Sequence, residues 1–167
     1  MKSTITIFLM LLLSTSCLGQ DDPVLRKELM LLKPLVGKTW VGEMTDPSGQ
    51  RTLHMSIKYE PMYDGKVIKC FKECQELNYQ SEGYYYYDSD KKEVSILMVC
   101  SNGNLTMGNV KPEDGKILQY GFTIFPDRKV EFRNLFEITP EGHLMDHFFS
   151  LKDGEWRAGH SAIYKIK

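Results

Sequence analysis

Short stretches of alternating apolar and polar residues follow one another along most of this chain, and each ends in a turn signal. In the stretch Arg51–Glu60, for example, Leu53, Met55, Ile57 and Tyr59 point one way while the residues between them point the other. The ten strands predicted in this way are Lys38–Thr45, Arg51–Glu60, Lys66–Glu76, Gly83–Asp88, Glu93–Cys100, Leu105–Val110, Lys116–Phe125, Val130–Ile138, Leu144–Leu151 and Glu155–Ile166.

The connections between these strands are short and rich in turn-forming residues. Asp46-Pro47-Ser48-Gly49 is one such turn, and Asp64-Gly65, Asp114-Gly115 and Lys152-Asp153-Gly154 are others. Short connections imply antiparallel hairpins. A long series of hairpins must protect its edge strands, and closure into a barrel removes the edges altogether. The sequence therefore predicts an all-β, closed, antiparallel up-and-down barrel of about ten strands; a flat sandwich with crossover connections is the alternative.

The residues before the first strand predict two further elements. Residues 1–19 have the charge, short apolar run and small residues of a signal peptide, and the apolar run is shorter than the roughly 20 residues that span a bilayer. Processing before Cys17 would instead give a lipid anchor at that residue. Residues 20–36 are expected to form a linker and a short helix across one mouth of the barrel, since Leu25, Leu29 and Leu32 share a helical face. Residues 37–167 then form a single barrel domain.

The composition and the signal segment limit the classes of partner and the cellular location that we expect. The chain has 167 residues with 21 basic and 22 acidic side chains, and no excess of basic charge is present to neutralise phosphates. We therefore expect no nucleic-acid partner. Because no apolar run of spanning length follows the signal segment, we also expect no transmembrane segment, and the signal itself predicts an exported protein that is periplasmic or tethered to the outer membrane as a lipoprotein. Beyond the signal, the odd number of cysteines (Cys70, Cys74 and Cys100) rules out a complete disulfide framework.

Several segments resemble calycins, the family of lipocalin-like β-barrels. The segment Leu35-Val36-Gly37-Lys38-Thr39-Trp40 resembles the opening strand of calycins, and Gly83-Tyr84-Tyr85-Tyr86-Tyr87 resembles the middle hairpin of secreted lipocalin-like families of unknown function. Gly154-Glu155-Trp156 and Ala162-Ile163-Tyr164-Lys165 add to this likeness near the end of the chain. The resemblance implies a calycin-type barrel with a small apolar ligand, and fatty-acid-binding proteins and the haem-binding nitrobindins are relatives in architecture.

Strand alternation selects candidate residues for the barrel interior. In the last strand, His160 shares a face with Trp156, Ala158 and Ala162, and the small alanines leave space beside it. In the eighth strand Asn134 lies on an otherwise apolar face, and a buried polar group needs a partner from protein, water or ligand. The residues predicted to line a ligand site are Trp40, Tyr84, Tyr86, Met98, Phe132, Asn134, Trp156 and His160.

Three functions remain open from the sequence. The first is a secreted binding barrel for a small apolar or amphipathic molecule, with His160 and Asn134 orienting its polar group. The second is a surface-acting envelope or interaction protein with a filled core. The third is an enzyme or a haem-binding calycin with His160 as the axial ligand, although the sequence has no nucleophile elbow, zinc motif or phosphate loop that would favour catalysis.

Overall fold

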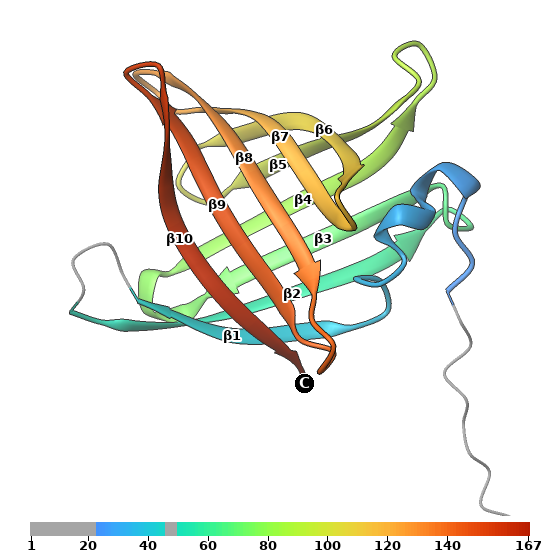
Figure 1. The fold of residues 1–167 in the computed structure, drawn as a ribbon, viewed down its shortest axis with the longest axis horizontal. Coiled ribbons are helices and arrows are strands. Elements are labelled where there is room, and N and C mark those ends of the chain that lie inside the picture. The colour runs from blue at the N-terminus through green and yellow to red at the C-terminus, as the bar shows by residue number, and fades with distance from the viewer. Residues whose placement is uncertain (1–22, 46–49) are drawn as a thin grey trace, which may run out of the picture.

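A computed structural model describes residues 23–45 and 50–167 of the chain. The signal peptide, the lipid-anchor residue Cys17 and the turn predicted at 46–49 lie outside the described residues. The described chain forms a closed antiparallel barrel in which each strand pairs with its neighbours in sequence and β1 closes the ring against β10 (Figure 1). The predicted up-and-down topology is confirmed, and no crossover connection interrupts the ring of described strands.

The strands lie close to their predicted positions. They are β1 Thr39–Thr45, β2 Thr52–Met62, β3 Val67–Cys74, β4 Tyr79–Asp88, β5 Glu93–Cys100, β6 Leu105–Glu113, β7 Lys116–Ile124, β8 Lys129–Ile138, β9 Leu144–Lys152 and β10 Glu155–Ile166. The third strand ends two residues earlier than predicted, because a short 3-10 turn, η2 Gln75–Leu77, connects it to β4. Asn78 follows this turn in the left-handed conformation, which the sequence signals only weakly.

The N-terminal helix is shorter than predicted and has a different geometry. Lys27–Leu32 forms a 3-10 helix, η1, instead of an amphipathic α-helix. The leucines at 29, 32 and 35 recur every three residues, which matches the three residues per turn of a 3-10 helix, and all three side chains are fully buried. The backbone N–H of Arg26 donates to the carbonyl of Gly65 at 2.9 Å and so fixes η1 against the β2–β3 turn. No helix among the described residues is long and apolar enough to cross a membrane.

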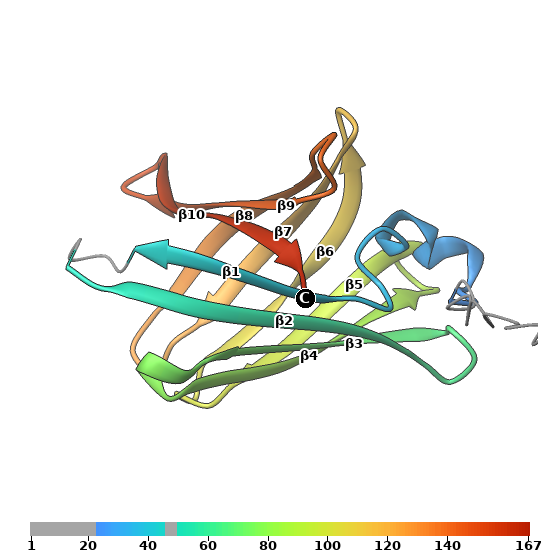
Figure 2. The same cartoon turned by 90° about the horizontal axis from the view of Figure 1, so that it is seen from below.

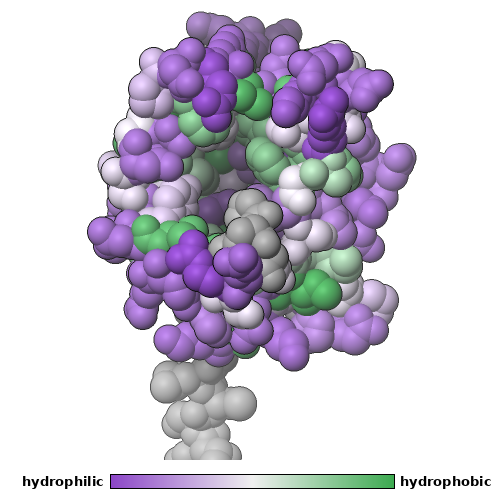
Figure 3. Space-filling view, turned by 90° about the vertical axis from the view of Figure 1, so that its left-hand side faces the viewer, coloured by the Kyte–Doolittle hydropathy of each residue, from purple (hydrophilic) through white to green (hydrophobic). Residues whose placement is uncertain are grey.

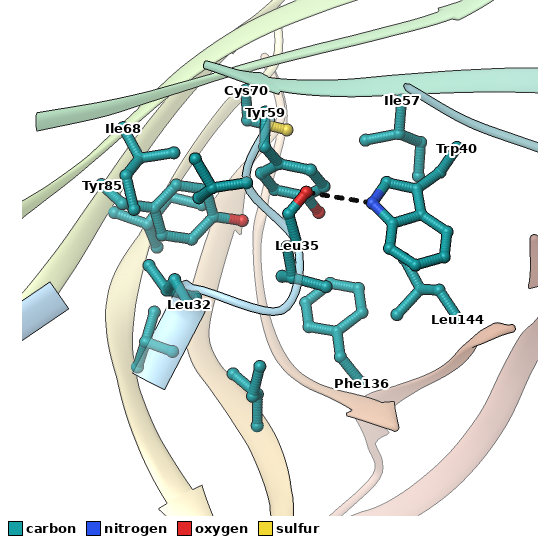
Figure 4. Packing of buried hydrophobic residues seen from close by; sticks show 14 of the residues in the cluster. Leu32, Leu35, Trp40, Ile57, Tyr59, Ile68, Cys70, Tyr85, Phe136 and Leu144 are labelled. Atoms are coloured by element: carbon teal, nitrogen blue, oxygen red, sulfur yellow. Dashed lines mark hydrogen bonds between the residues drawn. The ribbon is translucent and has the colours of Figure 1, made fainter. Parts of the chain in front are cut away.

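The barrel has two different ends, which Figure 2 shows from below. One mouth is covered by η1 and its leucines, and beneath them lies a packed core. Figure 4 shows Leu32, Leu35, Trp40, Tyr59 and Phe136 gathered in this packed half. The indole N–H of Trp40 donates to the carbonyl of Leu35 at 3.1 Å, which ties the first strand to the covering segment. The opposite mouth carries the turns β3–β4, β5–β6, β7–β8 and β9–β10.

A β-bulge in β10 changes the direction of side chains near the open mouth. Ser161 pairs with His147 of β9 but Ala158 pairs with Phe149, so β10 has one extra residue between these two pairs. Even-numbered residues before the bulge therefore point to the opposite face of the strand from even-numbered residues after it. Trp156 consequently pairs with Leu151 and points outward, where Arg133 of β8 lies over its ring at 4.5 Å. The inward placement predicted for Trp156 is wrong for this reason.

Candidate functional site

The interior beyond the packed half is hollow and opens at the mouth opposite η1. Figure 3 looks onto this side of the molecule and shows a hollow with apolar side chains on its border. An inner cavity of about 200 Å³ lies against β3–β8 and reaches His160. A second hollow of about 490 Å³ lies at the rim beside β7–β9. Thr123, Phe132 and Phe148 line both, so the two spaces adjoin and form one path from the rim inward.

The rim is mainly apolar, and the inner cavity has a larger share of polar surface. Phe125, Val130, Phe132, Phe148 and Leu151 supply the apolar surface of the rim. Deeper in, the lining changes to side chains that form hydrogen bonds or carry charge: Lys72, Tyr79, Asn104, Thr106, Gln119, Asn134 and His160. A concave site with apolar walls and a few convergent polar groups is the usual form of a small-molecule site in proteins.

Four of the predicted site residues come together in this cavity. Met98 of β5, Phe132 and Asn134 of β8, and His160 of β10 all line it. The alternation in β8 is as predicted: Phe132, Asn134 and Phe136 are buried on the inner face. Trp40 is also inside the barrel, but it lies in the packed half under Leu35.

Tyr84 and Tyr86 are on the outer face, so their predicted inward placement is wrong. Tyr84 pairs with the outward Lys69 and its hydroxyl donates to Glu82, while Tyr86 is 37% exposed. Tyr85 is the buried member of the tyrosine run, and its hydroxyl donates to the side-chain carbonyl of Gln119 at 3.2 Å. Four consecutive tyrosines carry no apolar–polar alternation, so the sequence could not distinguish the two faces. The hydrogen bond from Tyr85 to Gln119 joins the packed half to the cavity, because Tyr85 belongs to the buried core and Gln119 lines the cavity.

His160 is held between an aromatic ring and a carboxylate. Its ring stacks on Phe148 with centroids 5.1 Å apart and planes within 2°, and Phe148 stacks in turn on Phe132 at 6.0 Å. Its Nε2 lies 3.9 Å from Oδ2 of Asp146, a residue with only 1% of its surface exposed. One ring nitrogen of His160 therefore faces Asp146, and one face of the ring is covered by Phe148.

Asp146 and Lys72 are the charged interior residues that the sequence reasoning missed. Asp146 shares the inner face of β9 with Leu144 and Phe148, and Lys72 shares the inner face of β3 with Ile68, Cys70 and Cys74. The period-two alternation of both strands indicates that Asp146 and Lys72 face the interior. The sequence analysis did not place them there, because charged residues are usually exposed.

Buried polar atoms in and beside the cavity lack partners within the described protein. Asn134 Oδ1, Asp146 Oδ1 and Ser81 Oγ have no hydrogen-bond partner among the described side chains and backbone. Leaving a buried polar atom unpaired costs about 1–3 kcal/mol, so a native protein rarely does so without reason. Of these residues Asn134 lines the cavity, so its Oδ1 can accept a hydrogen bond from a molecule that enters.

The three cysteines of the described residues are thiols in the interior. Cys70, Cys74 and Cys100 are free and buried, and burial raises the pKa of Cys70 to about 11. Cys100 lines the cavity and its sulfur accepts a hydrogen bond from the Tyr79 hydroxyl at 3.3 Å. Within residues 23–45 and 50–167, no three His, Cys, Asp or Glu side chains come together as metal ligands.

Comparison of the sequence with protein-family models gives no match, and comparison with curated proteins gives none either. The chain is consistent with a calycin-like barrel through its fold alone, and its function is argued from the cavity.

Proposed function

We propose that this protein is a binding barrel for a small amphipathic molecule, which enters through the open mouth and occupies the hollow half of the interior. The observation that carries this proposal is the gradient from an apolar rim to an inner cavity in which Asn134, although buried, keeps a side-chain oxygen without a protein partner. An amphipathic molecule would place its apolar part against Phe132 and Phe148 and its polar group against Asn134 and His160.

The division of the barrel interior into a packed half and a hollow half supports this proposal. A protein that acted only through its surface would have no need for a hollow half, and a filled interior would give more buried apolar contact. Here η1 and the core around Trp40 stabilise one half. That half can therefore hold the fold while the other half accommodates a ligand. We expect the protein to be a carrier exported from the cytoplasm, as the leading segment of the sequence predicts.

The experiment is a fluorescence titration with a neutral apolar naphthylamine probe. We expect saturable binding with a blue shift, and we expect Ser150→Trp to abolish it, because Ser150 lines the rim and a tryptophan there would fill the path. Val99→Trp is the matched control: Val99 is 55% exposed on the outer face of β5, so the same ring is added outside the barrel. Equal probe binding by both variants and the wild type would contradict an interior site.

A second variant tests the polar end of the cavity. His160→Ala removes the ring that stacks on Phe148 and faces Asp146. We expect it to weaken binding of an amphipathic ligand by about tenfold, the effect of one hydrogen bond or ring contact of roughly 1.4 kcal/mol. Its thermal unfolding serves as the control, because a folded variant with unchanged affinity would remove His160 from the site.

A further inference from the structure

Lys72 is a cation placed inside the barrel. It lies on the inner face of β3, where its neighbours across the strands are Ile57 of β2 and Ser81 of β4, and it lines the inner cavity. Its Nζ lies 5.9 Å from the centre of the Phe136 ring, so the side chain extends across the interior from β3 toward β8. The outward Lys69, three residues earlier, instead pairs with Glu82 at 2.6 Å.

Lys72 has no anionic partner within the described protein. None of the ion pairs found within 4.0 Å among the described residues includes Lys72, and no hydrogen bond of its ammonium group is found there either. The interior carboxylate, Asp146, lies beside His160. Lys72 is partly buried and its ammonium group has the Phe136 ring as a cation–π contact, so the group is available to an anion that enters the cavity.

We propose that the ligand is a single-chain carboxylic acid whose carboxylate is bound by Lys72; this inference rests on the proposed function of the barrel. The carboxylate accepts hydrogen bonds from the Lys72 ammonium group at the inner end of the cavity. The alkyl chain then runs past Phe132 and Phe148 toward the apolar rim. The ligand therefore enters with its chain trailing toward the open mouth.

The charges of the cavity favour this class of ligand. One lysine matches the single charge of a carboxylate, whereas a phosphate carries more charge and usually has several donors around it. A cationic amine would be repelled by Lys72, and a neutral alcohol would leave the ammonium group without a counter-ion.

The test compares ligands with the same chain and different head groups. Decanoate, decanol and decylamine each compete with the neutral naphthylamine probe on the full-length protein as purified from cells. We expect decanoate to displace the probe at a concentration about tenfold lower than decanol, as one charge-assisted hydrogen bond predicts, and decylamine to be the weakest. Lys72→Met keeps the aliphatic length and should make decanoate and decanol equal, while Lys66→Met, an exposed lysine in the β2–β3 turn, should change nothing.

Each outcome decides the proposal. If decanoate and decanol compete equally on the wild type, the carboxylate inference is overturned, but probe binding still supports the barrel as a carrier. If Lys72→Met keeps the preference for decanoate, Lys72 is not the anchor and the inference is again overturned. If the variant fails to fold, the ranking of the three ligands on the wild type decides alone. A protein that binds neither the probe nor any of the three ligands removes both proposals.

Discussion

The indole of Trp40 shows how one residue joins two parts of this fold. Its side chain is fully buried, its N–H donates to the carbonyl of Leu35, and the ammonium group of Lys38 lies 5.5 Å from its ring centre. The sequence analysis predicted Trp40 as a wall of the ligand site, and its side chain does lie inside the barrel. It could not show which half of the barrel that position belongs to, since this depends on where η1 covers the mouth.

We predict that Trp40→Phe destabilises the protein. The substitution keeps an aromatic ring in the core but leaves the Leu35 carbonyl without its donor, which costs about 1–3 kcal/mol in the free energy of unfolding. Denaturant unfolding measures this cost. Tyr63→Phe, at a tyrosine that is 69% exposed, is the control and should have no effect. A Trp40→Phe variant as stable as the wild type would show that the hydrogen bond contributes nothing.

His54 provides a pH-dependent contact on the outside of the barrel. Its Nδ1 lies 2.5 Å from Oε1 of Glu76, and this hydrogen bond raises the pKa of His54 and lowers that of Glu76 to about 2. Because the pKa of His54 is raised on folding, the stabilisation is present below the unfolded pKa and is lost as pH rises through the folded pKa. We predict that Glu76→Gln lowers the pKa of His54 in an NMR titration. An unchanged pKa would mean that the pair does not form in solution.

At the scale of single elements, η1 acts as a cover for one mouth. Leu29 and Leu32 are fully buried, whereas Met30 between them is 44% exposed. We predict that Leu32→Ala lowers the free energy of unfolding by about 2–5 kcal/mol, because a buried leucine is lost and a cavity is left behind. Met30→Ala should change it by less than about 0.5 kcal/mol. Similar losses for both variants, measured by denaturant unfolding, would show that η1 does not pack as described.

The close pairing of β6 and β7 depends on two glycines. Gly108 and Gly121 are register partners, and a Cβ at Gly108 would lie 2.1 Å from the carbonyl oxygen of Tyr120. We predict that Gly108→Ala destabilises the protein by more than about 1 kcal/mol, since the backbone of β7 would have to move. Lys111→Ala, on the same strand and exposed, is the control for β6. A stable Gly108→Ala variant with unchanged ligand affinity would contradict this close approach.

The bulge in β10 shows what sequence alternation alone cannot predict. Alternation correctly placed Ala162 and Tyr164 inside, but it failed at Trp156 because one extra residue between Ala158 and Ser161 reverses the faces. Gly159 lies between these two residues, and a glycine inside a strand often marks a bulge, a signal that the alternation alone does not use. The outward position of Trp156 follows from the register with β9, which is a property of two strands rather than one.

For the whole molecule, the sequence was sufficient for the architecture. Turn residues, such as Asp64-Gly65 and Asp114-Gly115, lie between the alternating segments and mark where most strands end. Asp64 and Asp114 adopt the left-handed conformation that such turns require. The site was only partly predictable. Strand alternation correctly predicted that Asn134 and His160 face the interior. Lys72 was missed because charged residues usually prefer the surface, and a lysine inside a barrel departs from that preference.

The most direct test of the account is native mass spectrometry of the protein purified from the organism that makes it. The account predicts a discrete added mass on the folded chain, of the size of a single-chain amphipathic acid, and predicts that Ser150→Trp loses it while Val99→Trp keeps it. A bare mass for the wild type, together with no uptake of added decanoate or neutral probe, would contradict the central claim that the hollow half of the barrel is a ligand site.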